Sequence, residues 1–333
     1  MMVKKMIIKD LENFWEIDSQ SAFEALAIKT FYFQYEKNNV YRSFCDLINC
    51  HPAEITTLKD IPHLPISFFK SKKVCSFPPE DASFFSSSIT TGGIPSKHYY
   101  RQIEDYQMSF RKGFEYFFGA IEDFTVLALL PSYLERENSS LIFMTDDMIR
   151  NSRQAESGFY LNQWESLKQK LNQLEEKGQK TLLLGVSFAL LDLVEQYSFH
   201  LKNAWIMETG GMKGRRKELT REALHERLKK GFGVPKIHSE YGMTELLSQA
   251  YSRGEGIFEC PPWMNVVARE NQDPLCQLPW GQSGGLNIID LANRDSCAFI
   301  ATDDLAKVHS PSSFEVLGRL DASEIRGCNL MVI

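Results

Sequence analysis

Hydrophobic runs and amphipathic stretches alternate through the middle of the chain, from about residue 100 to residue 245. Four short apolar runs have the length of strands buried on both faces: residues 125–130, 181–184, 204–207 and 236–238. Four further stretches have helical spacing: residues 104–118, 160–174, 188–197 and 218–230. This alternation predicts βαβ units around a largely parallel sheet, whose ligands bind beyond the carboxyl ends of the strands.

The two flanks of this region have other patterns. Residues 11–38 predict one or two amphipathic helices, and the Pro- and Ser-rich residues 61–88 predict loops with short strands. Beyond residue 246, apolar runs separated by Gly, Pro and Asn predict a smaller antiparallel unit, with strands at residues 247–251, 264–268, 286–290 and 298–302. We therefore expect an α/β core over residues 1–245, a small β-rich subdomain over residues 246–317 and a short tail over residues 318–333.

Composition and charge exclude several classes of function. The chain has 333 residues, of which 43% are hydrophobic and 24% charged, as in ordinary globular proteins. A net charge of -6 argues against nucleic acid as a partner. No apolar run approaches the length of a membrane span, so we expect no integral membrane segment. Seven scattered cysteines without a C-x-x-C pair predict reduced thiols and a cytoplasmic protein.

A hydroxyl- and glycine-rich segment is the first candidate for chemistry. Residues 86–98 read SSSITTGGIPSKH. Glycine lets backbone N–H groups turn inward, hydroxyls add donors and Lys97 adds positive charge, so the segment suits a polyphosphate. It lacks the Walker pattern, and a plain surface turn remains the alternative when the segment is taken alone.

A second candidate follows the last apolar run of the parallel region. Residues 238–245 read HSEYGMTE. The ring of Tyr241 next to a glycine can stack on a planar base, the Thr244 hydroxyl can meet a phosphate oxygen, and the Glu245 carboxylate suits Mg²⁺. Alternatively, Tyr241 is a half-buried core aromatic and Glu245 a residue favoured at a helix N-terminus.

Two other classes of function compete. Residues 184–189 read LGVSFA and are similar to the nucleophile elbow of an α/β-hydrolase centred on Ser187, although Ser187 as the N-cap of the next helix is the simpler interpretation. His200, His225, His238 and His309 lie downstream as possible bases. The other class is a binding protein for nucleotide or acyl groups without turnover.

Taken together and in order, five segments resemble the adenylate-forming superfamily of acyl-CoA synthetases, adenylation domains and firefly-type luciferases. They resemble its phosphate loop, Gly-Gly segment, adenine and magnesium motif, ribose-binding motif and hinge. The segments are SSSITTGGIPSKH (86–98), ETGGMKGRR (208–216), YGMTE (241–245), ATDD (301–304) and GRLD (318–321). The resemblance implies the large N-terminal domain of that fold with a smaller β subdomain, and ATP and Mg²⁺ as cofactors.

A narrower resemblance runs along most of the chain. It connects this chain with the acyl-protein synthetase of the bacterial luminescence fatty-acid reductase. The segments that carry it are LPISFFKSKKV (64–74), LPSYLERENSSLIFM (130–144), ETGGMKGRR (208–216) and EIRGCNL (324–330). It implies activation of a fatty or other carboxylic acid with ATP and transfer of the acyl group to a cysteine. An acyl reductase, an acyltransferase or an acyl carrier protein would be the partner.

The superfamily assigns roles to individual residues. Ser87, Ser88, Thr90, Thr91 and Gly92 would embrace the β- and γ-phosphates. Gly210 and Gly211 would lie beside the adenine and the acyl group. Tyr241 would stack on adenine, Thr244 would touch the α-phosphate and Glu245 would hold Mg²⁺. Asp304 and Arg319 would bind the ribose, and Asp321 would be the hinge. By the narrower resemblance to the acyl-protein synthetase, Cys328 would be the acyl acceptor.

The chain departs from the superfamily at two places. Ile89 stands where the phosphate loop usually has its first glycine, and no lysine follows Lys307. We therefore expect the mobile C-terminal domain, with its catalytic lysine, to be absent. The expected chemistry is attack of an ionised carboxylate on ATP, followed by attack of Cys328 on acyl-AMP, with Arg326 lowering the pKa of the thiol. Coenzyme A is the competing acceptor.

Overall fold

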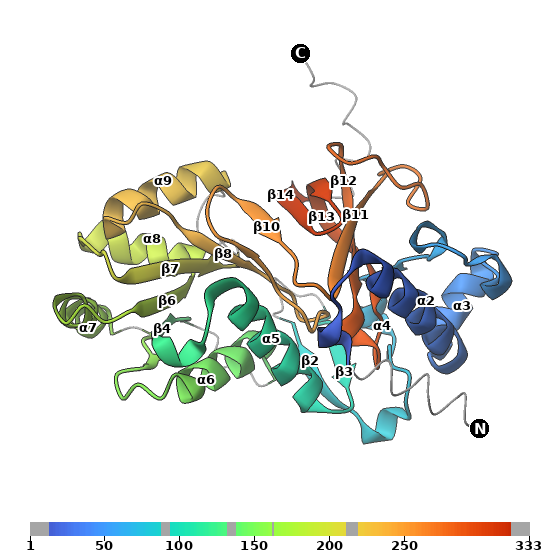
Figure 1. Ribbon diagram of the computed structural model, residues 1–333, viewed down its shortest axis with the longest axis horizontal. Coiled ribbons are helices and arrows are strands. Elements are labelled where there is room, and N and C mark those ends of the chain that lie inside the picture. Colours follow the sequence, from blue (N-terminus) through green and yellow to red (C-terminus); the bar gives the residue numbers. More distant parts are fainter. Residues whose placement is uncertain (1–12, 88–93, 132–137, 162, 211–218, 321–333) are drawn as a thin grey trace, which may run out of the picture.

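The chain is organised around one 12-stranded sheet in a computed structural model (Figure 1). The structure describes residues 13–87, 94–131, 138–161, 163–210 and 219–320. The strands of its main path lie in the order β11-β12-β13-β14-β10-β9-β8-β7-β6-β4-β5. The sheet is parallel from β5 to β8 and antiparallel from β8 to β11, so the two kinds of pairing meet where β8 contacts β9.

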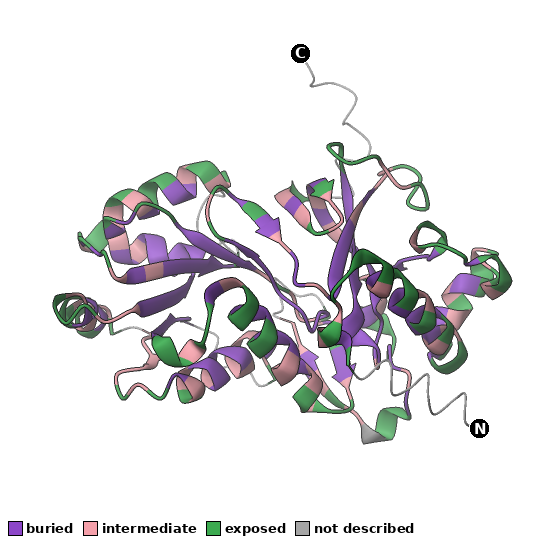
Figure 2. Ribbon diagram, in the orientation of Figure 1, coloured by how far each residue is buried: buried purple, intermediate pink, exposed green. Residues whose placement is uncertain are grey.

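The parallel half follows the predicted apolar runs closely. Its strands are β4 (Thr125–Leu129), β5 (Gly158–Phe159), β6 (Thr181–Val186), β7 (Ala204–Thr209) and β8 (His238–Tyr241). All residues of β4 and β6 are buried, as Figure 2 shows for the middle of the sheet. The strand expected at residues 236–238 is wrong in its bounds, because β8 starts at His238 and continues to Tyr241.

Helices cover both faces of the parallel half. They are α5 (Ile103–Phe118), α6 (Ser140–Ser152), α7 (Trp164–Glu176), α8 (Ser187–Gln196) and α9 (Arg221–Phe232). Side chains alternate along a strand. Val126 of β4 therefore packs in the core beneath α5 and α6, whereas Leu127 packs with α7, α8 and α9 in a separate core. This double burial confirms the α/β class.

Two expectations about this half are wrong in detail. Helix α7 begins at Trp164 rather than at residue 160, because residues 158–159 pair with β4 as β5. Helix α6 was not predicted, and it begins after Ser139, whose hydroxyl accepts the N–H of Ile142 at 3.4 Å.

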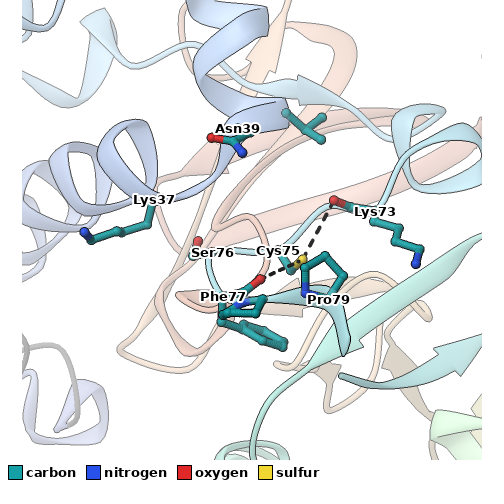
Figure 3. Close-up of a pocket in the computed structure, with 9 residues that line it drawn as sticks. Lys37, Asn39, Lys73, Cys75, Ser76, Phe77 and Pro79 are labelled. Atoms are coloured by element: carbon teal, nitrogen blue, oxygen red, sulfur yellow. Dashed lines mark hydrogen bonds between the residues drawn. The ribbon is translucent and has the colours of Figure 1, made fainter. Parts of the chain in front are cut away.

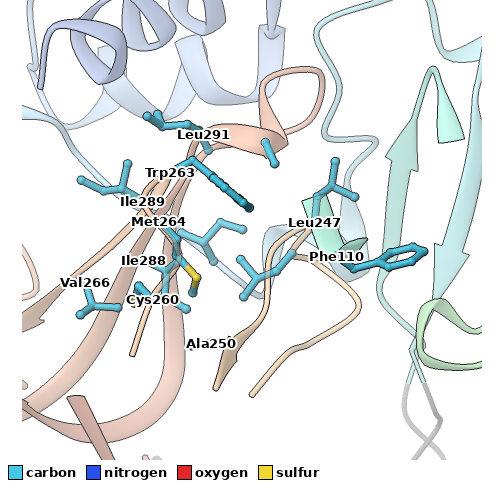
Figure 4. Close-up of a cluster of buried hydrophobic side chains, with 14 of the residues drawn as sticks. Phe110, Leu247, Ala250, Cys260, Trp263, Met264, Val266, Ile288, Ile289 and Leu291 are labelled. Atoms are coloured by element: carbon cyan, nitrogen blue, oxygen red, sulfur yellow. The ribbon is translucent and has the colours of Figure 1, made fainter. Parts of the chain in front are cut away.

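The antiparallel half has no long helix among the described residues after Phe232. Its strands are β9 (Ala250–Ser252), β10 (Ile257–Glu259), β11 (Met264–Arg269), β12 (Ser283–Asp290), β13 (Phe299–Ser310) and β14 (Ser313–Arg319). Figure 4 shows the apolar cluster around Trp263, where this half meets Phe110 of α5 and Leu247. The domain boundaries that we expect remain a prediction, and the sheet itself runs without interruption across residue 246.

Helices and short strands from the N-terminal part complete the fold. Helices α2 (Gln20–Lys37) and α3 (Asn39–Leu47) pack beside the antiparallel half, and β1 (Leu64–Pro65) pairs with β13. Helix α4 (Phe68–Ser71) precedes a separate hairpin of β2 (Ser83–Ser86) and β3 (Lys97–Tyr100). None of the described helices combines the length and the apolar character needed to cross a membrane.

Candidate active site

The predicted adenine residue lies at the end of β8, where parallel pairing changes to antiparallel pairing. Tyr241 pairs with Ala250 across the β8–β9 contact. Its hydroxyl donates to Oδ2 of Asp304 at 2.7 Å. The ring meets Phe258 and Phe314 edge to face, with centroids 5.7 and 5.2 Å away. Burial, together with the charge of Asp304, raises the pKa of Tyr241 well above its usual value, so the phenol keeps its proton.

The two residues predicted to bind the ribose lie next to each other because two adjacent strands of the sheet pair them. Asp304 of β13 and Arg319 of β14 are paired across the antiparallel ladder. Side chains opposite each other in such a ladder project side by side. Arg319 Nη1 lies 3.8 Å from Asp304 Oδ1, and Nη2 lies 3.6 Å from Asp303 Oδ2. Tyr241, Asp304 and Arg319 therefore form one cluster, with the guanidinium exposed and the Asp304 carboxylate buried.

The predicted magnesium residue is a buried carboxylate. Glu245 is 6% exposed, and burial raises its pKa. Interactions with the Ser96 side chain and with the Glu245 backbone N–H, together with the charges of Lys70 and Arg319, lower its pKa in part. No ion pair to this carboxylate occurs among the described residues. A buried carboxylate whose charge is left partly uncompensated fits a bound cation, which supports Mg²⁺ at this position.

The predicted phosphate loop starts and ends beside the same carboxylate. Hairpin β2–β3 brings its two described ends together, where Ser87 N–H donates to the Ser96 carbonyl at 3.1 Å and Ser96 N–H donates to the Ser87 hydroxyl at 2.9 Å. Two residues further on, Nδ1 of His98 lies 2.8 Å from the Thr244 carbonyl. Ser88, Ile89, Thr90, Thr91 and Gly92 lie outside the described residues. The two described ends of the loop thus lie close to the YGMTE segment.

The glycine pair lies at the end of β7, next to a buried polar network. Gly210 has φ +64°, a conformation that glycine adopts without strain, and Gly211 lies outside the described residues. The Gly210 carbonyl accepts from the Ser187 hydroxyl at 2.6 Å. The same hydroxyl donates to Oε2 of Glu208 at 2.8 Å. Glu208 Oε1 lies 3.6 Å from Nε2 of His225.

This network corrects both interpretations of Ser187. The residue is the first of α8, and the N-cap is Val186, so Ser187 does not cap the helix. It also does not fit a hydrolase nucleophile: it is 1% exposed, and its proton is directed to a carboxylate and a carbonyl rather than to a histidine. Ser187 anchors the strand ends instead.

Other predicted residues lie outside the part of the chain that the structure describes. They are Asp321, Arg326 and Cys328. Within that part, no group of three His, Cys, Asp or Glu side chains is arranged to hold a metal ion.

Three residues of this region were missed by the sequence analysis. His98, Asn293 and Lys70 come from β3, the turn η6 (Leu291–Asn293) and α4. His98 and Asn293 are in contact although 195 positions separate them in the chain. A single sequence contains no signal for such a contact, and Lys70 resembles any surface lysine.

A cavity of about 320 Å³ is lined by residues of the N-terminal part of the chain (Figure 3). Its wall includes Lys37, Lys73, Phe77 and Pro79, and the Cys75 thiol donates to the Phe77 carbonyl at 3.4 Å. No predicted site residue is among the described residues that line it. The nucleotide site that we expect therefore lies at the strand ends.

Comparisons with known structures identify the fold. A 2-hydroxyisobutyryl-CoA ligase in its postadenylation state superimposes with a TM-score of 0.64 at 11% identity, covering 90% of this chain and 68% of that one. ATP-bound MatB from Rhodopseudomonas palustris gives a TM-score of 0.53 at 14% identity, covering 73% of this chain and 49% of that one. The fold is that of the adenylate-forming ligases, as the resemblance implied.

Comparisons with known sequences identify the family. The long-chain-fatty-acid–luciferin-component ligase of Aliivibrio fischeri is 24% identical, over 95% of this chain and 89% of the relative. The protein with the same name from Vibrio harveyi is 23% identical, with the same coverage. The family model described as "Acyl-protein synthetase, LuxE" matches residues 5–333. This chain therefore belongs to the LuxE acyl-protein synthetase family.

Proposed function

We propose that this chain uses ATP to activate a long-chain fatty acid as acyl-AMP and then carries the acyl group as a thioester on Cys328. Family membership makes it an acid-activating ligase, and the names of its relatives supply the substrate class. The observation that carries the site assignment is the shared position of Glu245, the Tyr241–Asp304–Arg319 cluster and both ends of the phosphate loop.

The first half-reaction requires positioning rather than a general base. The substrate carboxylate is already ionised near neutral pH, so its oxygen can attack the α-phosphorus of ATP directly. An O–P bond to that oxygen forms, the bond to the β-phosphate oxygen breaks, and pyrophosphate leaves. Tyr241 and Asp304 would hold the nucleoside, and Thr244 would orient the α-phosphate. Mg²⁺, held by Glu245, would neutralise charge on the phosphate oxygens.

The second half-reaction requires a thiolate. The Cys328 sulfur would attack the carbonyl carbon of acyl-AMP, a C–S bond would replace the C–O bond to phosphate, and AMP would leave while the thiol proton passes to solvent. An acyl reductase, an acyltransferase or an acyl carrier protein would then receive the acyl group.

ATP–pyrophosphate exchange over a panel of carboxylic acids tests the first half-reaction. We expect exchange that depends on both Mg²⁺ and a long-chain acid, and that falls for short acids. No exchange with any acid would reject the proposal in favour of nucleotide binding without turnover.

The Cys328→Ser variant tests the second half-reaction. It should keep exchange but lose the hydroxylamine-sensitive label that radioactive fatty acid leaves on the protein. Cys276→Ser, which replaces an exposed cysteine of the antiparallel half, is the matched control and should keep the label. Labelling of Cys328→Ser at the wild-type level would place the acyl group elsewhere, and thioester formation only with added coenzyme A would assign that acceptor.

A further inference from the structure

Two buried side chains, His98 and Asn293, bind the backbone at Glu245, the proposed magnesium ligand. Nδ1 of His98 lies 2.8 Å from the Thr244 carbonyl, and its Nε2 lies 2.8 Å from the side-chain oxygen of Asn293. The Asn293 side-chain nitrogen donates to the Glu245 carbonyl at 2.8 Å. His98 and Asn293 are both fully buried. The two side chains therefore bridge two consecutive carbonyl groups of the YGMTE segment.

The same corner of the fold fixes the residues that follow. Oδ2 of Asp290 accepts the N–H groups of Leu247 and Ser248 at 2.8 and 3.0 Å. Asp290 ends β12 and Asn293 ends the turn η6, so one short stretch holds the main chain from Glu245 to Ser248. The segment has no regular structure from Gly242 to Gln249, and these contacts replace the backbone ladder that it lacks.

The cluster is also tied to the carboxylate and to α4. Ser96, whose side chain lowers the pKa of Glu245, lies two positions before His98 in an extended segment, so both side chains face the same way. Phe69 of α4 packs edge to face against the His98 ring, with centroids 6.0 Å apart. Because His98 meets the main chain while Ser96 meets the carboxylate, one strand sets both the position and the direction of the Glu245 side chain.

From this geometry we infer that His98 and Asn293 are positioning residues that hold Glu245 for its metal ion. This inference rests on the proposed function, and it adds two residues that touch neither nucleotide nor metal. Partners that orient a metal-binding residue commonly change metal affinity about 10- to 100-fold when they are removed. We expect a loss of that size here.

The contacts suggest which variants separate positioning from folding. A ring that donates from both nitrogens satisfies all the contacts at once, whereas burial lowers the pKa of His98 to about 4 and favours the neutral ring. A neutral ring donates from one nitrogen only, so its tautomer decides whether it keeps the bond to the Asn293 side chain or the bond to the Thr244 carbonyl. His98→Asn places an amide nitrogen near the position of Nδ1 and should preserve this bond, whereas His98→Leu removes both contacts at similar volume.

The test measures the binding of Mn²⁺ in the presence of ATP and in the absence of any acid substrate. The electron paramagnetic resonance signal of free Mn²⁺ reports how much of the ion is bound. We expect the Kd for Mn²⁺ to be lowest in the wild type, higher in His98→Asn and highest in His98→Leu and Asn293→Ala. In the last two variants it should be about 10-fold or more above the wild-type value. His63→Leu, a buried histidine that packs on Phe299, is the control for loss of a core imidazole and should leave the Kd unchanged.

Melting temperatures measured on the same samples show which variants are folded. A folded His98→Leu or Asn293→Ala protein with the wild-type Kd would overturn the inference. If His98→Leu does not fold, Asn293→Ala and His98→Asn decide in the same way. Failure of the wild-type protein to bind Mn²⁺ with ATP would instead reject the magnesium site itself.

Discussion

Two buried acidic regions at the strand ends differ in how their charge is compensated. Glu208, at the end of β7, is 5% exposed, and burial alone would raise its pKa. The pKa is nevertheless lowered, because four neighbours outweigh the effect of burial: His225, Arg221, Ser239 and Ser187. Glu245, just past the end of β8, is 6% exposed and burial raises its pKa, although the Ser96 side chain, the Glu245 N–H and the charges of Lys70 and Arg319 lower it in part.

The difference indicates what each region does. Glu208 has its positive and hydroxyl partners within the fold, so it stabilises the strand ends and needs no ligand. Glu245 has equal burial but too little compensation, which is the arrangement expected where a cation from solution completes the site. Perturbed carboxylates point to functional sites only when their partners are counted, and on this basis we propose a structural role for Glu208 and a metal-binding role for Glu245.

The largest effect is expected for Glu245→Gln. The change keeps the shape of the side chain and removes the negative charge that would hold Mg²⁺. ATP–pyrophosphate exchange should fall about 100-fold or more. The melting temperature above pH 7 should be equal to or higher than that of the wild type, because a carboxyl whose pKa is raised on folding destabilises the folded state once it ionises. Exchange within a few-fold of the wild type would remove Glu245 from the metal site.

The converse result is expected for Glu208→Gln. Loss of the charge leaves Arg221 and His225 without their anion, so the free energy of unfolding at pH 7 should fall by about 2 to 3 kcal/mol, with Mn²⁺ and ATP binding unchanged in the folded fraction. Because the pKa of Glu208 is lowered on folding, this stabilisation is present above the unfolded pKa and disappears as the pH falls through the folded value.

Urea unfolding at pH 7 and at pH 4 measures both parts of that prediction. Glu226→Gln, which breaks an exposed pair with Lys229, is the control and should change the free energy of unfolding by less than about 0.5 kcal/mol. A Glu208→Gln protein that is as stable as the control, or that loses nucleotide binding instead of stability, would contradict the structural role of Glu208.

The smallest effect is expected at the ribose residue. Asp304→Asn keeps an acceptor for the Tyr241 hydroxyl but loses the charged acceptor for the ribose hydroxyls, so KM for ATP should rise about 10-fold with kcat little changed. Asp303→Asn, at the neighbouring carboxylate that also pairs with Arg319, should have a weaker effect. Equal shifts in the two variants would mean that only the charge near Arg319 matters.

The sequence predicts the scaffold of the site better than its supporting contacts. Strands β4, β6 and β7 start where the apolar runs start, because a strand buried on both faces must be apolar throughout. The Asp304–Arg319 pair follows from antiparallel register, which a local pattern does not specify. The contacts of His98 with Thr244 and Asn293 join segments 146 and 195 positions apart and could not be predicted, because they depend on tertiary packing alone.

A crystal structure with a non-hydrolysable acyl-adenylate analogue, such as an acyl sulfamoyl adenosine, would show directly whether the nucleotide binds at the proposed site. The account predicts adenine against the Tyr241 ring, the ribose hydroxyls on Asp304 and Arg319, and the bridging group beside Thr244 and Glu245. A nucleotide bound elsewhere, for example in the cavity between Lys37 and Lys73, with Tyr241 and Glu245 making no contact to it, would contradict the account.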